Sequence, residues 1–512
     1  MDGQPEQTVT DWGPFGRPLF QDPAARALRR VGVIDVGSNS VRMVVFDGAA
    51  RSPAYFYNEK VMCGLGSEIG ETGRLSPDGR RRALAAIRRF VALAEGMDIP
   101  PLTAVATAAV RSAEDGPDFC ADVLRETGLT VYVIDGEEEA RLSAQGVLLG
   151  WPEAEGLVCD IGGSSMELAE VSGGKVGARA STALGPLRLK TLKGGRKGRK
   201  AEIDAVLDDL ATHVPRHDRL YLVGGSWRAI ARLDMLRRGY PLSVLHDYVM
   251  TPKSVRATLD WVDEHDLDSL RQTARLSEAR ISLVPVAGEV LRRLMKTYAI
   301  KEIHTSGYGI REGMLYEQMP ERLRARDPLV EACRYDEARN ARLPGFGRTL
   351  HNFIAPLFRG SNTPDRLIKC ACLLHDVSWR AHPDYRAEVC FDNSTRANFG
   401  GIDHPGRIYL GLALLHRYRN ALPSTLADDL LDLLPEGKLR EAEVLGKAMR
   451  FGAMFSINQP ERMGNLRYHP KKKLLILTLP PEAAPLYGEV AAARFASLAK
   501  ALGVETEVKL GR

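Results

Sequence analysis

The stretch VGVIDVGSNSVRMVVFD, Val31 to Asp47, decides how this chain is organised. An apolar strand leads to Asp35, a turn of small polar residues follows, and a second apolar strand returns. A near-copy, GLVCDIGGSSMELAEV, lies at Gly156 to Val171 and carries Asp160 at the position of Asp35. Short apolar runs around a Gly/Ser turn are typical of β-hairpins. Two copies predict a duplicated structure with one such hairpin in each half.

The two hairpin turns are candidate phosphate-binding loops. Backbone N–H groups in tight turns bind anions, and a neighbouring carboxylate can hold a hard cation such as Mg²⁺. We therefore expect the turns to face each other across a cleft, with Asp35 and Asp160 as metal ligands. The candidate phosphate-binding residues of the turns are Ser38, Asn39, Ser40, Gly162, Gly163, Ser164 and Ser165.

Predicted strands and helices alternate from residue 31 to about residue 320, which is typical of α/β domains. Two later strands, at 219–223 and 302–305, run into small-residue turns and then into helices. Free N–H groups at a helix N-terminus favour anions. The turn residues Gly224, Gly225, Ser226 and Gly307 are therefore further candidates for phosphate binding. Other predicted elements are strands at 55–63, 102–106 and 130–134 and helices at 77–96 and 117–126.

Changes in composition and in the pattern of predicted elements divide the sequence into five parts. Residues 1–30 are polar and rich in Pro and Gly, so a flexible arm is expected there. The basic, Gly-rich segment 190–200 is predicted to be a loop, either simply solvated or a guide for a polyanion. The parts are the arm at 1–30, α/β domains at 31–150 and 151–320, a helical domain at 321–470, and a small α+β segment at 471–512 with strands 474–479 and 505–510 around a helix at 484–502.

Bulk composition narrows the function. A chain of 512 residues is too long for one core. Its net charge of +5 suits an anionic substrate but does not indicate a DNA-binding domain. Seven scattered Cys without paired zinc spacing favour a reducing, cytoplasmic location. No signal peptide is recognised, and no apolar run approaches the roughly 20 residues that span a bilayer, so no membrane association is expected.

Six separated motifs resemble the exopolyphosphatase / guanosine pentaphosphate phosphohydrolase (PPX/GppA) family of the actin, Hsp70 and sugar-kinase superfamily. They are IDVGSNSVRM at 34–43, TAAVRSA at 107–113, DGEEEARL at 135–142, DIGGSSMEL at 160–168, VGGS at 223–226 and SGYGIREGMLYE at 306–317. The resemblance covers residues 30–320. It implies two duplicated actin-like (ribonuclease H-like) α/β domains around a cleft, followed by an α-helical HD-like domain.

The resemblance also implies roles for single residues. Glu139 corresponds to the base that activates water, although a shift of one residue in the alignment would give Glu138. Arg111 corresponds to an arginine that can fork onto two phosphate oxygens. Glu167 is a weaker candidate for positioning water or metal. A base between the two hairpins favours a water-using hydrolase over a sugar kinase or an actin-like ATPase.

In the helical region, His351, His375 and Asp376 match the beginning of an HD metal set, which Asp403 or His404 could complete. A full set could bind a divalent ion and cut a phosphoester. The alternative is a helical scaffold without hydrolytic activity.

The chain departs from the family pattern at two places. Ser164 and Met166 stand where the family usually has Gly and Thr, and Trp227-Arg228 stands where small residues or Thr are usual. We expect these changes to reshape the far side of the cleft, which leaves the substrate preference open.

The resulting functional hypothesis is an Mg²⁺-dependent exopolyphosphatase that processively releases orthophosphate from inorganic polyphosphate. Mn²⁺ is an alternative ion, and a monovalent cation is an additional candidate. The alternative enzyme is a pppGpp 5′-phosphohydrolase that yields ppGpp. An alternative of another class is a non-catalytic (p)ppGpp-binding sensor, and an HD-domain phosphohydrolase with an inert cleft is a third. A homodimer is implied by the resemblance.

Overall fold

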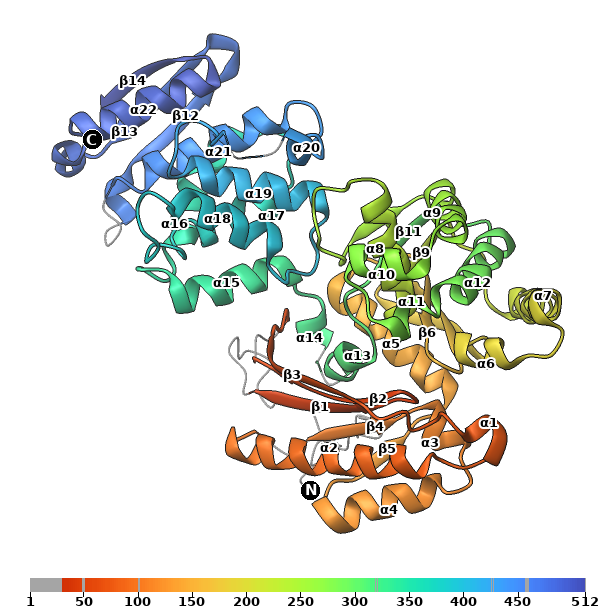
Figure 1. Ribbon diagram of the computed structural model, residues 1–512. Helices are drawn as coiled ribbons and strands as arrows, with labels where there is room; N and C mark the ends of the chain where they lie inside the picture. The colour runs from red at the N-terminus through yellow and green to blue at the C-terminus, as the bar shows by residue number, and fades with distance from the viewer. Residues whose placement is uncertain are drawn as a thin grey trace, which may run out of the picture. The chain divides into compact units, whose positions relative to one another are not determined.

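The computed structural model describes residues 30–47, 51–99, 102–317, 319, 321–424, 426, 428–455 and 460–511. The expected arm at 1–30 lies outside these residues except for Arg30. The chain divides into two compact units, drawn in Figure 1, at Arg326/Asp327. The short segment Pro241–Val244 groups with the second unit.

The first sheet of the first unit has five strands in the order β3-β2-β1-β4-β5. Its hairpin is the predicted one: β1 and β2 pair antiparallel with Asp35 opposite Arg42, and β1 pairs parallel with β4. Apolar β-branched residues fill β1, which is buried along almost its whole length. The strands are β1 (Val31–Val36), β2 (Ser40–Phe46), β3 (Tyr55–Met62), β4 (Thr103–Ala106) and β5 (Val131–Val133).

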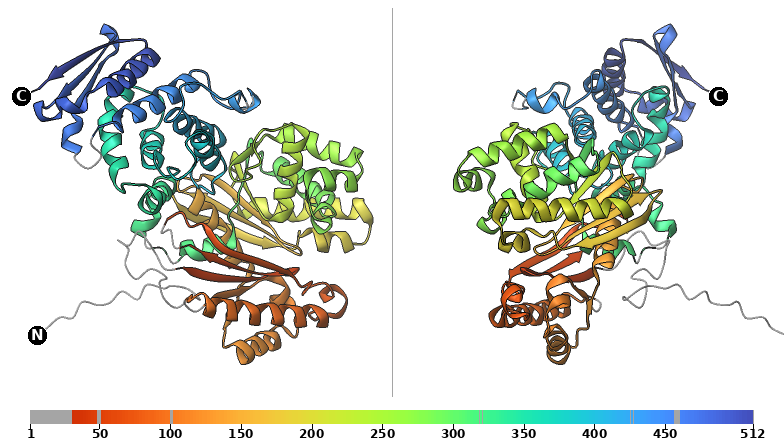
Figure 2. Two further views of the ribbon diagram at one scale, coloured as in Figure 1. Left: turned by 60° about the vertical axis from the view of Figure 1, so that its left-hand side comes forward. Right: turned by 90° about the vertical axis from the view of Figure 1, so that its right-hand side faces the viewer.

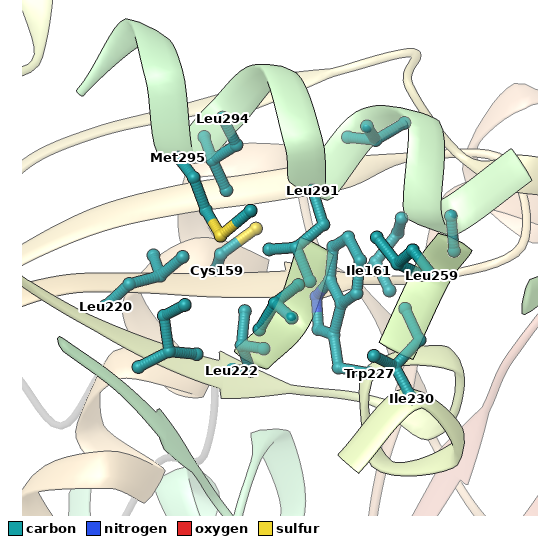
Figure 3. Packing of buried hydrophobic residues seen from close by; sticks show 14 of the residues in the cluster. Cys159, Ile161, Leu220, Leu222, Trp227, Ile230, Leu259, Leu291, Leu294 and Met295 are labelled. Atoms are coloured by element: carbon teal, nitrogen blue, oxygen red, sulfur yellow. The ribbon is translucent and has the colours of Figure 1, made fainter. Parts of the chain in front are cut away.

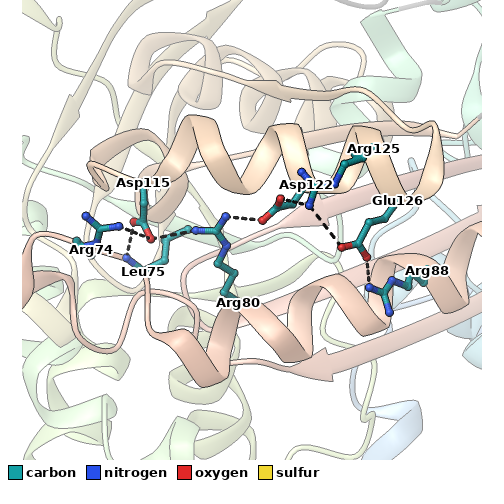
Figure 4. Close-up of polar contacts among 8 residues, drawn as sticks. All are labelled: Arg74, Leu75, Arg80, Arg88, Asp115, Asp122, Arg125 and Glu126. Carbon is teal, nitrogen blue, oxygen red and sulfur yellow. Dashed lines mark hydrogen bonds and ion pairs between the residues drawn. The ribbon is translucent and has the colours of Figure 1, made fainter.

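Helices α2 and α4 lie side by side on one face of this sheet (Figures 1 and 2). Helix α2 begins at Pro77, where the Ser76 hydroxyl accepts a hydrogen bond from the Gly79 N–H. Its apolar face, including Ile87 and Phe90, packs into the core beneath the sheet. Ion pairs such as Arg80–Asp115 at 3.3 Å link the two helices (Figure 4). The helices of this half are α1 (Ile69–Thr72), α2 (Pro77–Gly96), α3 (Ala108–Ser112), α4 (Gly116–Thr127) and α5 (Gly136–Gly150).

The second sheet repeats the plan of the first. Its order, read from the other edge, is β8-β7-β6-β9-β11, with β10 added beyond β11. The hairpin β6–β7 takes the place of β1–β2, and β6 again pairs parallel with the next strand, β9. The expected duplication is therefore confirmed. The strands are β6 (Gly156–Ile161), β7 (Met166–Ser172), β8 (Lys175–Thr182), β9 (Arg219–Val223), β10 (Tyr248–Met250) and β11 (Glu302–Thr305).

A large apolar core lies between the second sheet and its helices. Trp227 is fully buried there among Ile161 and Leu291 (Figure 3). The expectation that Trp227 reshapes the site is therefore wrong, because its ring packs into this core. The helices are α6 (Pro186–Thr191), α7 (Gly195–His213), α8 (Gly225–Arg237), α9 (Pro252–Glu264), α10 (Leu267–Ala274), α11 (Glu278–Ile281), α12 (Val284–Thr297), α13 (Ile310–Glu317) and α14 (Glu321–Arg324).

The prediction of a loop over residues 190–200 is also wrong. Helix α6 runs to Thr191 and α7 begins at Gly195, so the connection is only three residues long. Gly194 and Gly195 have φ angles of 92° and 57°, which makes the turn. The Arg and Lys residues that follow favour helix, and Arg199 is fixed by a hydrogen bond of 3.1 Å from its Nε to Glu289.

The second unit is a helical bundle followed by a small three-stranded sheet in the order β12-β13-β14. Strand β12, within the region expected to be helical, is short and mostly polar, and its pairing with β13 defines it. The elements are α15 (Pro328–Asn340), α16 (Phe346–Ile354), η2 (Ala355–Phe358), α17 (Asp365–Leu374), α18 (Arg386–Arg396), α19 (His404–His416), α20 (Asp428–Leu431), α21 (Lys438–Gly452), η3 (Pro460–Met463), β12 (Asn465–His469), η4 (Pro470–Lys472), β13 (Leu474–Leu479), η5 (Pro481–Leu486), α22 (Glu489–Leu502) and β14 (Glu505–Leu510).

In the part of the chain that the structure describes, none of the helices combines the length and the apolar character needed to cross a bilayer.

Candidate active site

The two hairpin turns meet. The hydroxyl oxygens of Ser38 and Ser164 lie 3.3 Å apart. Both turns are closed by the same hydrogen bond of 3.0 Å, from Gly37 N to Ser40 O and from Gly162 N to Ser165 O. The predicted phosphate-binding loops are thus brought together, as the duplication of their sequences implies.

Three of the predicted acidic residues converge beside these turns. Burial raises the pKa of Glu139 to about 8, with further contributions from Asp160 and Asp35, while Arg111 opposes the shift. The side chain of Glu139 is 7% exposed. A buried carboxylate close to two others is held partly in its protonated form, which suits a group that must exchange a proton.

Glu139 lies in the first turn of helix α5, which places its side chain near Asp35 and Asp160. The N-cap of this helix, Asp135, accepts a hydrogen bond of 2.7 Å from the Glu138 N–H. The Glu138 carboxylate is bound by Arg141, with nitrogen–oxygen distances of 2.6 and 2.8 Å, and Glu137 is largely exposed. Of the acidic triplet, only Glu139 reaches the other carboxylates, so the geometry supports Glu139 over Glu138.

Two glycines fix α5 against α13. A Cβ atom on Gly146 would lie 2.2 Å from the Gly309 carbonyl oxygen, and one on Gly313 would lie 1.8 Å from that of Leu142. No larger residue fits at either position without moving a helix. Because α5 carries Glu139 and α13 carries Arg311, this contact sets the relative positions of two site residues.

Arg111 lies on the short helix α3 and reaches the base. Its Nη1 donates to the Ile134 carbonyl at 2.6 Å and to Oε2 of Glu139 at 3.3 Å. About a quarter of the Arg111 side chain is exposed. Nη1 is therefore anchored by two acceptors, while part of the side chain stays accessible.

Asp160 and Glu167 stand directly opposite each other in the β6–β7 hairpin. Asp160 accepts a hydrogen bond from the Ser143 hydroxyl, and Ser181 Oγ donates to Glu167 Oε1 at 2.9 Å. Burial raises the pKa of both carboxyls; Glu139 and Asp160 raise that of Glu167 further. Glu167 Oε2 is buried and receives no hydrogen bond from any described residue.

Four cations that the sequence does not predict as phosphate ligands complete the site. Arg311 donates from Nη1 to Asp35 Oδ2 at 3.0 Å. Burial, followed by repulsion from Arg311, lowers the pKa of Arg42 to about 10 and also lowers that of Arg228. Burial and Arg280 lower the pKa of Lys60. Cations that disfavour one another in this way would all be stabilised by an anion.

The sequence offered a partial signal for these cations. Arg42 and Arg311 lie within the motifs that carry the family resemblance, and Arg228 stands where the family usually has small residues or Thr. Of the expected reshaping by Trp227-Arg228, only Arg228 takes part, because its guanidinium donates to the carbonyls of Gly224 and Gly307 at 3.1 Å each.

The remaining predicted phosphate-binding residues differ in their availability. Gly224 has φ of 109°, and Gly225 and Ser226 open helix α8 as expected. The Gly307 N–H donates to His246 Nδ1 at 3.1 Å. The prediction that this N–H serves a phosphate therefore does not fit the arrangement observed.

The HD candidates of the second unit have other partners. His351 Nε2 is 2.9 Å from Asp365, and His375 Nδ1 donates to the Cys372 carbonyl at 2.8 Å. Asp376 accepts two hydrogen bonds from Arg342, at 2.6 and 2.7 Å. Burial, followed by Arg417, lowers the pKa of His375 to about 4. Asp403 caps α19 by accepting from the Gly406 N–H at 2.7 Å.

A metal set in the helical unit is therefore not assembled. Over the described residues of both units, no group of three or more His, Cys, Asp or Glu side chains is arranged to hold a metal ion. An arginine occupies both oxygens of the carboxylate that the HD prediction assigned to the ion.

Comparison with known proteins gives two family matches. A model described as the Ppx/GppA phosphatase family matches residues 44–322. A model described as the exopolyphosphatase C-terminal region matches residues 349–508. Together they cover most of both units.

Individual proteins show the same likeness at low identity. Retrograde regulation protein 2 of Saccharomyces cerevisiae is 24% identical over 455 residues, which cover 77% of this chain and 73% of that protein. Exopolyphosphatase 1 of Mycobacterium tuberculosis is 25% identical over 308 residues, 57% of this chain and 88% of that protein. The crystal structure of an exopolyphosphatase from Cytophaga hutchinsonii has a TM-score of 0.51 at 23% identity, covers 57% of this chain and 98% of its own, and shares the fold.

Proposed function

This chain belongs to the Ppx/GppA phosphatase family, and on that premise we propose that it is an exopolyphosphatase that processively releases orthophosphate from the ends of inorganic polyphosphate. One observation carries the proposal: the buried carboxylate of Glu139 is paired with Arg111 beside two facing small-residue turns. The Mycobacterium relative that bears the name exopolyphosphatase supports the same choice.

Glu139 is the base in this proposal. A general base works best when its pKa lies near the working pH, and the pKa of Glu139 is raised to about 8. Its carboxylate takes a proton from a water molecule as the water oxygen forms a bond to the terminal phosphorus. The anhydride P–O bond breaks, so that orthophosphate leaves and the chain is one phosphate shorter.

Charge neutralisation falls to the cations around the turns. Phosphoryl transfer depends mainly on positioning and on stabilising charge on the phosphate oxygens. Arg111 would bind the terminal phosphate, because Nη1 is anchored to the Ile134 carbonyl and part of the side chain is accessible. Arg42, Arg228 and Arg311 would hold the following phosphates, since an anion would relieve their mutual repulsion.

The acidic residues fit Mg²⁺. Asp35, Asp160 and Glu167 offer hard oxygen donors, and Glu167 Oε2 is buried without a donor among the described residues. Mg²⁺ usually keeps several waters and is held by one or two carboxylates plus substrate phosphates, so a complete protein cage is not required. When bound, the ion would neutralise charge on the phosphate oxygens. Mn²⁺ has the same ligand preferences, and a monovalent cation could add to the same screening.

A regulatory role is the second candidate, and one comparison favours it. The yeast relative, which aligns with 77% of this chain, bears the name retrograde regulation protein 2. A (p)ppGpp sensor would use the same cations to bind phosphates but would release none. A pppGpp 5′-phosphohydrolase would use Glu139 in the same way, because pppGpp also ends in a phosphoanhydride.

One assay distinguishes these three candidate functions. Phosphate release is measured with Mg²⁺ from long-chain polyphosphate and from pppGpp, side by side, with the wild-type chain. Faster release from polyphosphate supports the proposal, and faster release from pppGpp supports the alternative enzyme. Binding of either ligand without release of phosphate supports the sensor.

A further inference from the structure

A small cavity lies in the helical unit at the position of the HD-like motif. Its volume is about 20 Å³. It is lined by Arg342, Leu343, Phe346, His375, Asp376, Arg417 and Ala453. Two guanidinium groups thus face one carboxylate, which gives the cavity an excess of positive charge where a cation site was expected.

Arg417 is the unusual member of this group. Its side chain is buried, with only 9% of the residue exposed. Its Nε is fully buried and has no hydrogen-bond partner among the described residues. The ring of Tyr418 lies 4.8 Å from Cζ of Arg417, measured to the ring centre. The Asp376 carboxylate also favours the Arg417 charge, but both of its oxygens accept hydrogen bonds from Arg342. One carboxylate shared between two guanidinium groups leaves a buried excess of positive charge, which is unfavourable, so an anion bound beside Arg417 would stabilise it.

His375 adds an acceptor to the cavity. The carbonyl of Cys372 can only accept a hydrogen bond, so Nδ1 of His375 carries the proton and Nε2 carries a lone pair. An anion that itself has an O–H group can donate to this nitrogen while it accepts from Arg417. Hydrogen phosphate has such a group, and sulfate at neutral pH has none.

We propose that this cavity binds hydrogen phosphate, with one oxygen inserted beside Arg417 and the P–OH group directed at His375. The cavity volume supports a single inserted oxygen, because a space of this size holds about one water molecule. Arg342 is half exposed and marks the solvent side, where the rest of the ion is held. The site is separate from the hairpin turns and does not depend on the proposed function.

The test is scanning calorimetry of the full chain in phosphate-free buffer and with added inorganic phosphate or sulfate. The variant is Arg417→Met, and the matched control is Arg419→Met, which removes an exposed arginine paired with Glu388 at 2.7 Å. A ligand that binds the folded chain raises its melting temperature. Phosphate bound at the hairpin turns contributes equally to all variants and cancels in the comparison.

We expect Arg417→Met to melt no lower than the wild type without phosphate, because the buried excess positive charge is removed. Phosphate should raise the melting temperature of the wild type and of Arg419→Met more than that of Arg417→Met. Sulfate should produce a smaller difference between the variants. Equilibrium dialysis with labelled phosphate should show roughly tenfold weaker binding at one site in Arg417→Met, the loss expected for one charge-assisted hydrogen bond.

Two outcomes would overturn the proposal. One is a phosphate-dependent shift in Arg417→Met equal to that of the wild type. The other is a large loss of stability in phosphate-free buffer, which would make Arg417 a structural residue. Should Arg417→Met not fold, Arg417→Lys keeps the charge and most of the stem but loses the planar fork; undiminished phosphate binding by that variant, measured by dialysis, would count against the site.

Discussion

Ser38 and Ser164 place their hydroxyl oxygens 3.3 Å apart, although 126 residues separate them in the chain. Each residue lies in a turn closed by an equivalent hydrogen bond, so the contact joins the corresponding points of the two duplicated halves. Ser164 is also one of the residues that depart from the family pattern. A phosphate bound by both turns would replace this direct contact with hydrogen bonds to its own oxygens.

Changing Glu139 to Gln should lower phosphate release roughly 10²-fold to 10⁴-fold, because the amide cannot accept the proton of the attacking water. Glu137→Gln is the control, since Glu137 lies two residues earlier on the same helix and its side chain is 66% exposed. The measurement is kcat with polyphosphate and with pppGpp. Near-normal rates in Glu139→Gln on both substrates would show that another group is the base.

The unfolding free energy of the chain should depend on pH because Glu139 titrates differently in the folded and unfolded states. Its pKa rises from about 4.5 to about 8 on folding, so between these values the folded chain holds a proton that the unfolded chain has released. Stability from this group is therefore present below about pH 4.5 and is lost as the pH rises through 8. The difference in unfolding free energy between wild type and Glu139→Gln should fall across this window. A difference independent of pH would contradict the burial of this carboxyl.

Removal of Mg²⁺ with a chelator should stop phosphate release, and added Mg²⁺ should restore it. Glu167→Gln should raise the Mg²⁺ concentration for half-maximal activity by roughly 10-fold to 100-fold, the range seen when groups that support a bound metal are lost. Glu170→Gln, on the same strand but paired with His217 at 2.9 Å, is the matched control. Equal Mg²⁺ dependence in both variants would remove Glu167 from the metal site.

Trp227→Ala should lower the unfolding free energy by about 3–5 kcal/mol, because the indole is fully buried in the core of the second sheet. The KM for polyphosphate should change little under conditions where the variant is folded. Trp261→Ala, at the partly buried edge of the same core, should cost less. A large change in KM with little loss of stability would place Trp227 in the site after all.

Much of the fold could be predicted because the local signals agree with the tertiary contacts. The limits of α2 and β9 are those predicted, since a capped amphipathic helix and a buried apolar strand have clear patterns. The loop predicted at 190–200 is wrong because the glycines there form one sharp turn between two helices. The HD motif suggested a metal site that the described residues do not form, because residue types alone do not reveal that Arg342 binds Asp376.

By itself, the sequence determined the duplication, the two small-residue turns with their aspartates, and the residue types at Glu139 and Arg111, because these depend on short-range pattern. Tertiary structure decided which charges meet. Arg311 comes to Asp35 from 276 positions away, and α5 approaches α13 closely enough to set Glu139 only because two glycines allow it. Burial and charge repulsion depend on such long-range neighbours, so the pKa of Glu139 and the cluster of cations emerge only in the folded chain.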